Sequence, residues 1–189
     1  MRKTGIIIGS LSDLDQCLRG FEYLIKMVEK KLAEVYWVDA SSQHRHTLII
    51  QSILAQYSMV PAGEKIDALI MGAGWANHLS GCADSFLRYT LQDGDITVIG
   101  VAFEDPENLT HARAAILSSS EVPGNQMILE NDKGESLVGE KGFLWACQHA
   151  VEGTLPKVKA KTPPEYKRMT IYKARDLALE MKKIKEKEV

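Results

Sequence analysis

The chain has 189 residues, an apolar fraction of 45%, a charged fraction of 25% and a formal net charge of −2. These values are typical of a single globular domain, long enough to bury a full core without disulfides or metals. They exclude recruitment of nucleic acid or membrane by bulk charge. No apolar run approaches the roughly 20 residues of a membrane-spanning helix, so we expect no membrane partner.

The cysteines indicate a reducing compartment. Cys17, Cys82 and Cys147 lie far apart, contain no CxxC pair and are odd in number. We interpret them as reduced thiols, mostly buried in helices of a cytoplasmic protein. No Cys/His cluster has the spacing of metal ligands, so we expect no metal site. The first apolar run, residues 6–8, is too short for the core of a signal peptide.

Short β-branched apolar runs alternate with helical patterns along most of the chain. The predicted strands cover residues 5–9, 35–38, 66–71, 96–101 and 126–129. The predicted helices cover residues 14–31, 45–57, 82–90, 109–117 and 141–151. This alternation is typical of βαβ units and predicts an α/β fold with a parallel sheet and right-handed crossovers.

The character of the chain changes near Gly153. A connector rich in proline and lysine precedes residues 165–188, which are predicted to form a charged helix with one thin apolar stripe. We therefore divide the chain into an α/β catalytic domain, residues 1–152, and a linker with a C-terminal helix, residues 153–189.

Two interpretations of this C-terminal helix stay open. It packs either on a neighbouring subunit or on its own domain. Its lysines are interrupted by Glu180, Glu186 and Glu188, a pattern typical of a solvated face. The sequence therefore gives little reason to expect nucleic-acid binding.

The first three predicted strands each end in a loop rich in Gly, Ser or His. In a parallel sheet these ends share one edge, which is where open α/β sheets bind ligands. The first loop, residues 9–13, has a glycine, two serines and a helix start, which are the parts of a phosphate cradle. Asp13 can accept hydrogen bonds from ribose hydroxyls. The alternative is that Ser12 or Asp13 only caps the helix.

The second loop contains Ser42, His44 and Arg45. Arginine offers a forked cation to phosphate, and histidine exchanges a proton near neutral pH. A cation at a helix N-terminus opposes the helix dipole, and an anion bound between Arg45 and the first loop would explain its position. The alternatives are an exposed arginine and a turn histidine satisfied by backbone groups.

The third loop, residues 72–81, brings small residues to the same edge. Gly72, Ala73 and Gly74 suggest a flat ligand lying against the main chain. Trp75 could stack on such a ligand, serve as a lid or subunit contact, or pack in the core. For His78, helix capping and a direct chemical role are both open. His46, His111 and His149 lack such surroundings and are interpreted as structural or surface residues.

With these loops assembled, the chain resembles the family of 5-(carboxyamino)imidazole ribonucleotide mutases and phosphoribosylaminoimidazole carboxylases of purine biosynthesis. GSLSD at residues 9–13 corresponds to the family pattern GSxSD, SQHR at residues 42–45 to SAHR, and GAGWANHLSG at residues 72–81 to AGGxxHLPG. The resemblance covers residues 4–150. It implies a three-layer flavodoxin-like (Rossmann-like) domain, a compact homo-octamer with a C-terminal helix reaching a neighbour, and no cofactor.

The resemblance also implies roles for residues at the motif positions. The ribonucleotide substrate would be held by Gly9, Ser10, Ser12, Asp13, Ser42, Arg45, Gly72, Ala73, Gly74 and Leu79. His44 would be the general acid/base, and His78 is the second catalytic candidate. The implied reaction moves a carboxyl group onto C4 of aminoimidazole ribonucleotide, and the His-Leu-x-Gly form of the third loop is similar to the mutase branch.

Other functions stay open beside the mutase. A direct carboxylase would use carbon dioxide, and a paralogue would act on another ribonucleotide-like substrate. Departures from the family pattern at Gln43, Ser80 and residues 108–121 motivate the paralogue. A pure binding module is the last alternative, although binding alone does not need the imidazole of His44.

Overall fold

The computed structural model describes residues 1–187 and contains a parallel sheet of four strands in the order β2-β1-β3-β4. The strands are β1 (Arg2–Ile8), β2 (Ala33–Ala40), β3 (Ala68–Ala73) and β4 (Thr97–Ala102). Every pairing is parallel. The predicted α/β class and parallel sheet are confirmed.

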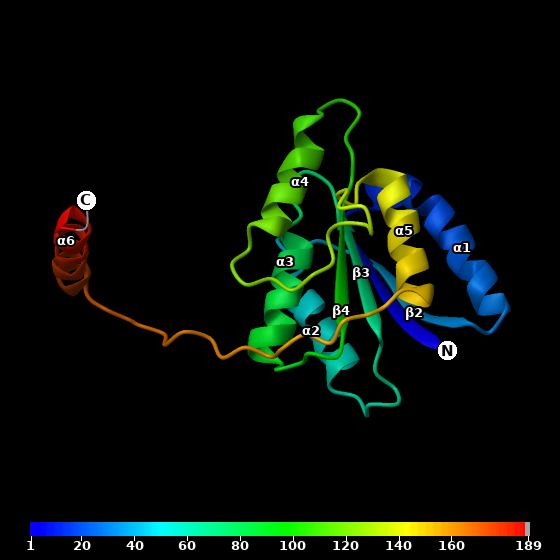
Figure 1. Ribbon diagram of the computed structural model, residues 1–189, viewed down its shortest axis with the longest axis horizontal. Coiled ribbons are helices and arrows are strands. Elements are labelled where there is room, and N and C mark those ends of the chain that lie inside the picture. The colour runs from blue at the N-terminus through cyan, green and yellow to red at the C-terminus, as the bar shows by residue number, and fades with distance from the viewer. Residues whose placement is uncertain (188–189) are drawn as a thin grey trace.

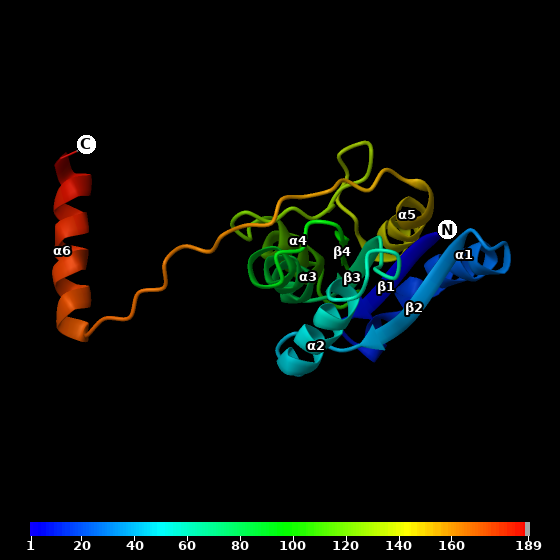
Figure 2. The ribbon, with the colours of Figure 1, turned by 90° about the horizontal axis from the view of Figure 1, so that it is seen from below.

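Helices cover both faces of the sheet (Figures 1 and 2). One layer contains α1 (Leu18–Glu29), preceded by a 3₁₀ turn at Leu11–Cys17, and α5 (Gly139–Glu152). The opposite layer contains α2 (Thr47–Ser58), α3 (His78–Ser85), a π-helical continuation at Phe86–Thr90, and α4 (Thr110–Ser120). The result is the three-layer flavodoxin-like arrangement.

Alternate residues of the strands belong to two hydrophobic cores, one on each face of the sheet. Ile6 and Ile8 of β1 pack toward α1 and α5, whereas Ile7 packs toward α2 and α3. All residues of β3 and β4 are buried. Strands covered on both faces carry uninterrupted apolar runs, which is why these segments were recognisable in the sequence.

The predicted fifth strand is reduced to one bridge. Ile128 pairs in parallel with Ile99 and nothing else in residues 126–129 extends the ladder. The turn at residues 131–134 then folds the chain back, and Leu137 donates its N–H to the Leu129 carbonyl at 2.9 Å. The turn interrupts the pairing with β4, which resumes only at a second parallel bridge between Ala102 and Val138.

Helix boundaries differ from the prediction at the ends that face the loops. The third helix begins at His78 rather than Cys82, because Asn77 acts as N-cap and its side chain accepts the Ser80 N–H. The second begins at Thr47 rather than Arg45. The first long helix has a 3₁₀ beginning and ends at Glu29. Small and polar residues before these starts carry no periodic signal.

A buried polar network stabilises the α3–β4 corner. Asp84 pairs with Arg88 one helical turn later at 2.9 Å, and both side chains are 1% exposed. Arg88 also donates to the carbonyl of Asp93 at 2.8 Å. The Asp93 carboxylate accepts hydrogen bonds from Ser58 at 2.6 Å and Lys65 at 2.9 Å. Buried charges are tolerated here because each has hydrogen-bonded partners.

The C-terminal segment leaves the domain in two stages. As far as Lys161 it runs along the domain, where Val158 donates to the Gly94 carbonyl and Lys161 to that of Arg88. After Pro163 and Pro164 it departs, and α6 (Ile171–Lys187) stands apart from the domain (Figures 1 and 2). We predicted that this helix begins at residue 165, whereas α6 begins at Ile171. Its predicted last residue, Glu188, lies outside the described residues.

No helix in residues 1–187 combines the length and apolar character needed to cross a bilayer. Of the three cysteines, Cys17 and Cys147 are buried as predicted, whereas Cys82 is exposed. Burial raises the pKa of the Cys17 thiol to about 12, and nearby Asp13 and Asp15 add to the effect. Cys17 is therefore a packing residue in its neutral form.

Candidate functional site

The main cavity of this site lies at the carboxyl ends of β1 and β3. The connection after β1 passes to the α1 layer, whereas the connection after β3 passes to the α3 layer. This divergence of neighbouring parallel strands is the topological switch point at which α/β sheets bind ligands. The cavity has a volume of about 620 Å³, within the range of small-molecule sites.

The cavity brings together all but one of the residues singled out from the sequence. Its lining includes Gly9, Ser10, Ser12, Asp13, Ser42, His44, Arg45, Ala73, Gly74, His78 and Leu79. Gly72 is the exception, because it is buried within β3, where a Cβ would lie 2.5 Å from the Phe103 ring. Its carbonyl instead accepts the Gly9 N–H at 2.7 Å.

The first loop is held tightly against the third. A Cβ on Gly9 would lie 2.7 Å from the Cβ of Ala73, so only glycine allows this approach. Ser10, rather than Ser12 or Asp13, is the N-cap of the 3₁₀ turn. Its Oγ accepts the N–H of Ser12 at 3.3 Å and the Ser12 hydroxyl at 2.9 Å. Both hydroxyls therefore sit at the start of a helical segment, beside the cavity.

Asp13 links the same two loops electrostatically. Burial raises the pKa of its carboxyl group, and a hydrogen bond from the Gly74 N–H partly opposes that effect. Asp13 is half-buried and lines the cavity. A carboxylate that already accepts one backbone N–H keeps further lone pairs, which suit hydroxyl donors better than phosphate.

Arg45 supplies the positive charge of the site. One of its guanidinium nitrogens, Nη2, donates to the Gly9 carbonyl at 2.8 Å, which ties the second loop to the first. Within residues 1–187 its guanidinium forms no ion pair with a carboxylate. Because arginine carries five N–H donors, most of its hydrogen-bonding capacity is available to an anion.

Ser41 and Ser42 are neighbouring buried serines in different situations. The Ser41 hydroxyl lies 2.6 Å from Nδ1 of His46. Ser42 lines the cavity, yet its Oγ is buried and has no hydrogen-bond partner in the described part of the chain. An unpaired buried hydroxyl is uncommon and calls for an explanation.

The third loop presents Trp75 and His78. Trp75 is 68% exposed, lines the cavity and has φ of 56°. It is therefore not a core residue. His78 is the first residue of α3, where the capping role belongs to Asn77. The imidazole is thus not used as a cap.

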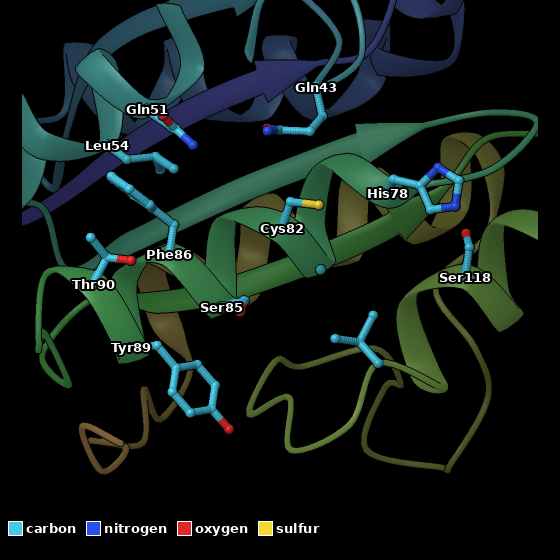
Figure 3. A pocket seen from close by; sticks show the side chains of 12 residues that line it. Gln43, Gln51, Leu54, His78, Cys82, Ser85, Phe86, Tyr89, Thr90 and Ser118 are labelled. Carbon is cyan, nitrogen blue, oxygen red and sulfur yellow. The ribbon is translucent and has the colours of Figure 1, made fainter. Parts of the chain in front are cut away.

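A second cavity of about 340 Å³ adjoins the first and lies between α2, α3 and the end of α4 (Figure 3). Gln43 and His78 line both cavities. The remaining lining of the second cavity includes Cys82, Phe86 and Tyr89. His78 therefore stands at the junction of the two spaces, with access to both.

Some lining residues were missed by the sequence argument. Gln43 was treated as a departure from a motif and Ala76 was not singled out, yet both line the main cavity. His111 was interpreted as a structural or surface residue, and its ring stacks on Trp75 with centroids 4.3 Å apart, which is a structural contact. No sequence signal predicted this last contact, because it depends on how α4 packs against the third loop.

No protein-family model matches this chain, and no curated protein matches it. Among residues 1–187 there is no cluster of three or more His, Cys, Asp or Glu side chains arranged to hold a metal ion. A function for this protein is therefore inferred from the geometry of the cavity and from the three loop motifs.

Proposed function

We propose that the main cavity binds a phosphoribosyl substrate and that the protein moves a carboxyl group onto C4 of aminoimidazole ribonucleotide. The observation that supports this best is the meeting of Arg45, the serines of the first loop and His44 in one cavity of about 620 Å³. A phosphate site and a titratable imidazole in one space are what this reaction requires.

The phosphate would lie between the first and second loops. Arg45 supplies the charge, while Ser10 and Ser12 supply hydroxyls at a helical N-terminus. Ser42 adds a hydroxyl that has no other partner within residues 1–187. The ribose hydroxyls would then face Asp13, whose carboxylate is held by the Gly74 N–H.

The base would lie against the third loop. Ala73 and Gly74 present main chain rather than bulky side chains, and buried Leu79 closes the apolar side. Such a wall keeps water from a small apolar molecule such as carbon dioxide. Gln43 and His78 supply polar groups at the far side of the same space.

His44 is the proposed general acid/base of the mutase reaction. Its protonated imidazole gives a proton to the carbamate nitrogen as the N–C bond breaks, releasing carbon dioxide within the site. Ring carbon C4 then attacks the carbon dioxide, and His44 takes the C4 proton, which restores the imidazolium. The same group serves both transfers, so the reaction is an isomerisation and none of its steps draws on a cofactor.

A second candidate function has support in the sequence of the site. Trp75 stands where the family pattern has a small residue, and Ser80 stands where it has proline. A direct carboxylase would share the phosphate site and take carbon dioxide from solution. A paralogue acting on another ribonucleotide-like substrate would keep the phosphate site and change the contacts to the base.

We also propose that the protein is a homo-oligomer, an octamer as the resemblance implies. Exposed apolar residues of the stripe on α6 include Ile171, Leu177, Met181 and Ile184. An isolated helix of this length is only marginally stable in water, and its stability normally comes from tertiary packing. Packing of α6 on a second copy would cover this stripe.

The test is to mix the purified protein with 5-(carboxyamino)imidazole ribonucleotide without added bicarbonate and follow the ultraviolet absorbance. Conversion to the C4-carboxylated product is expected, and His44→Asn should abolish it while ribose 5-phosphate still binds. Turnover that survives in His44→Asn removes His44 from its role. Turnover that depends on added bicarbonate favours the direct carboxylase.

A further inference from the structure

Trp75 occupies a backbone conformation that bulky side chains rarely adopt. Its φ is 56°, in the left-handed region. The other non-glycine residues of this kind in residues 1–187 are Lys31 and Gln92, which are exposed polar residues. A large aromatic residue in this region is a true outlier, and such strain gathers at ligand sites.

The indole ring has a rigid backing on one face. Its centroid lies 4.3 Å from that of His111, and the two ring planes differ by 26°. Nδ1 of His111 lies 2.7 Å from the Asp105 carboxylate, and Nε2 lies 3.0 Å from the amide nitrogen of Asn108. The Asn108 oxygen accepts from the N–H and hydroxyl of Thr110. Because both ring nitrogens are engaged, the imidazole cannot turn freely.

Beyond its contact with His111, Trp75 keeps exposed surface and lines the main cavity. Trp75 lines the main cavity, whereas His111 does not. With one face against His111, the side chain is still 68% exposed. The neighbouring residue Gly74 lines the same cavity as Ser10, Ser12 and Asp13, so the ring stands beside the same space as the phosphate residues.

From this geometry we propose that Trp75 is a stacking platform for the heterocyclic base of the ligand, and that His111 positions it from behind. This inference rests on the proposed function, because it assumes that a ribonucleotide occupies the main cavity. The face of an indole is a large apolar surface that stacks on any planar base. A ligand with phosphate and ribose alone would gain nothing from it.

A stacking role would explain why Trp75 keeps a left-handed backbone conformation. The contact with His111 holds the ring in place beside the cavity before a ligand arrives. A ring fixed in advance loses little conformational freedom on binding. The inference therefore names a base-recognition residue that the family motifs do not contain.

The experiment uses the full chain with Trp37→Phe and Trp145→Phe, which leaves Trp75 as the only tryptophan of the three. Trp75 fluorescence is followed during titration with aminoimidazole ribonucleotide and, separately, with ribose 5-phosphate. We expect strong quenching by the ribonucleotide and little by the sugar phosphate. Equal quenching by both, or binding of the ribonucleotide without quenching, overturns the platform.

Variants in the otherwise natural sequence separate stacking from folding. Trp75→Ala should weaken binding of aminoimidazole ribonucleotide at least tenfold and leave ribose 5-phosphate binding unchanged, while Trp75→Phe should keep most of the affinity. His111→Ala should give a smaller loss, which His111→Phe should restore because it keeps an aromatic backing. Equal ribonucleotide affinity in Trp75→Ala and the natural sequence overturns the inference.

Titration with a panel of nucleotides that includes adenosine and uridine monophosphates distinguishes a failure of the stacking platform from a failure of the proposed function. If aminoimidazole ribonucleotide neither binds nor reacts, but another nucleotide quenches Trp75 and loses affinity in Trp75→Ala, the platform stands and the proposed function fails. If the mutase reaction is observed and Trp75→Ala binds its substrate normally, the function stands and the platform fails. No quenching by any member of the panel overturns the platform.

Discussion

Replacing Ser42 by alanine should raise stability and lower affinity at the same time. Ser42 is 7% exposed, and its hydroxyl has no hydrogen-bond partner within the described residues. A buried donor without a partner costs about 1–3 kcal/mol. Removing it should therefore stabilise the unliganded protein by about 1 kcal/mol, which for a chain of this size corresponds to a Tm increase of about 2–4 °C.

The effect on binding has the opposite sign. When ligand is bound, we expect the Ser42 side chain to rotate and donate to a phosphate oxygen. A hydrogen bond to a charged group contributes about 1.5–3 kcal/mol. Ser42→Ala should therefore weaken ribose 5-phosphate binding by about 10- to 150-fold. Thermal unfolding of the free protein and calorimetric titration measure the two quantities independently.

Ser41 is the matched control. It is 9% exposed, adjacent in sequence and hydrogen-bonded to His46 at 2.6 Å. Ser41→Ala should lower the free energy of unfolding by about 0.5–1.5 kcal/mol and leave ligand affinity unchanged. If Ser42→Ala instead behaves like Ser41→Ala in both measurements, Ser42 is an ordinary structural serine and the reasoning about the phosphate site is wrong.

Three further changes test other parts of the structure. Gly9→Ala places a Cβ 2.7 Å from that of Ala73 and should cost about 1–3 kcal/mol in urea unfolding, whereas Gly63→Ala, with nothing within 4 Å of the added Cβ, should be nearly neutral. Burial raises the pKa of Asp93, but its hydrogen bonds outweigh burial and leave it below the ordinary 3.8. Because the unfolded chain then binds more protons, the stabilisation by Asp93 is complete above pH 3.8 and is lost as the pH falls through the lowered pKa. The difference in unfolding free energy between Asp93→Asn and the natural sequence should therefore shrink as the pH falls below 3.8. A difference that stays constant with pH contradicts the lowered pKa of Asp93. Deleting residues 165–189 should lower the assembly mass in light scattering, and an unchanged mass with a lower Tm would mean that α6 packs on its own domain.

Several elements of the fold were predictable because their sequence signals are local. Residues 5–8 of β1, all of β3 and residues 98–102 of β4 form runs of apolar residues and glycine, since both faces of the sheet are covered. Elements that depend on tertiary contacts were predicted less well. The first turn of α3 was taken for a loop, because its start is set by the Asn77 cap and its small residues show no periodicity. Residues 126–129 have strand composition but make one bridge.

The candidate site, like the fold, was predictable from the sequence only in part. The loops at residues 9–13, 42–45 and 72–81 were expected to converge, because parallel strands end at one edge, and the main cavity does contain residues from all of them. The parallel direction of the strands is enough to bring these three loops to the same edge of the sheet. Their relative strength as ligand contacts was not predictable, since it depends on the Arg45–Gly9 bond and on the unpaired hydroxyl of Ser42.

By itself the sequence determined the α/β class, the strands and the edge at which the polar loops meet, because hydrophobic periodicity and chain direction act over short distances. Only the tertiary structure decided which side chains face one another across that edge. The stacking of Trp75 on His111 joins α4 to the third loop, and the burial of Gly72 behind Phe103 removes it from the cavity. These contacts arise from how whole elements pack, and no local pattern encodes them.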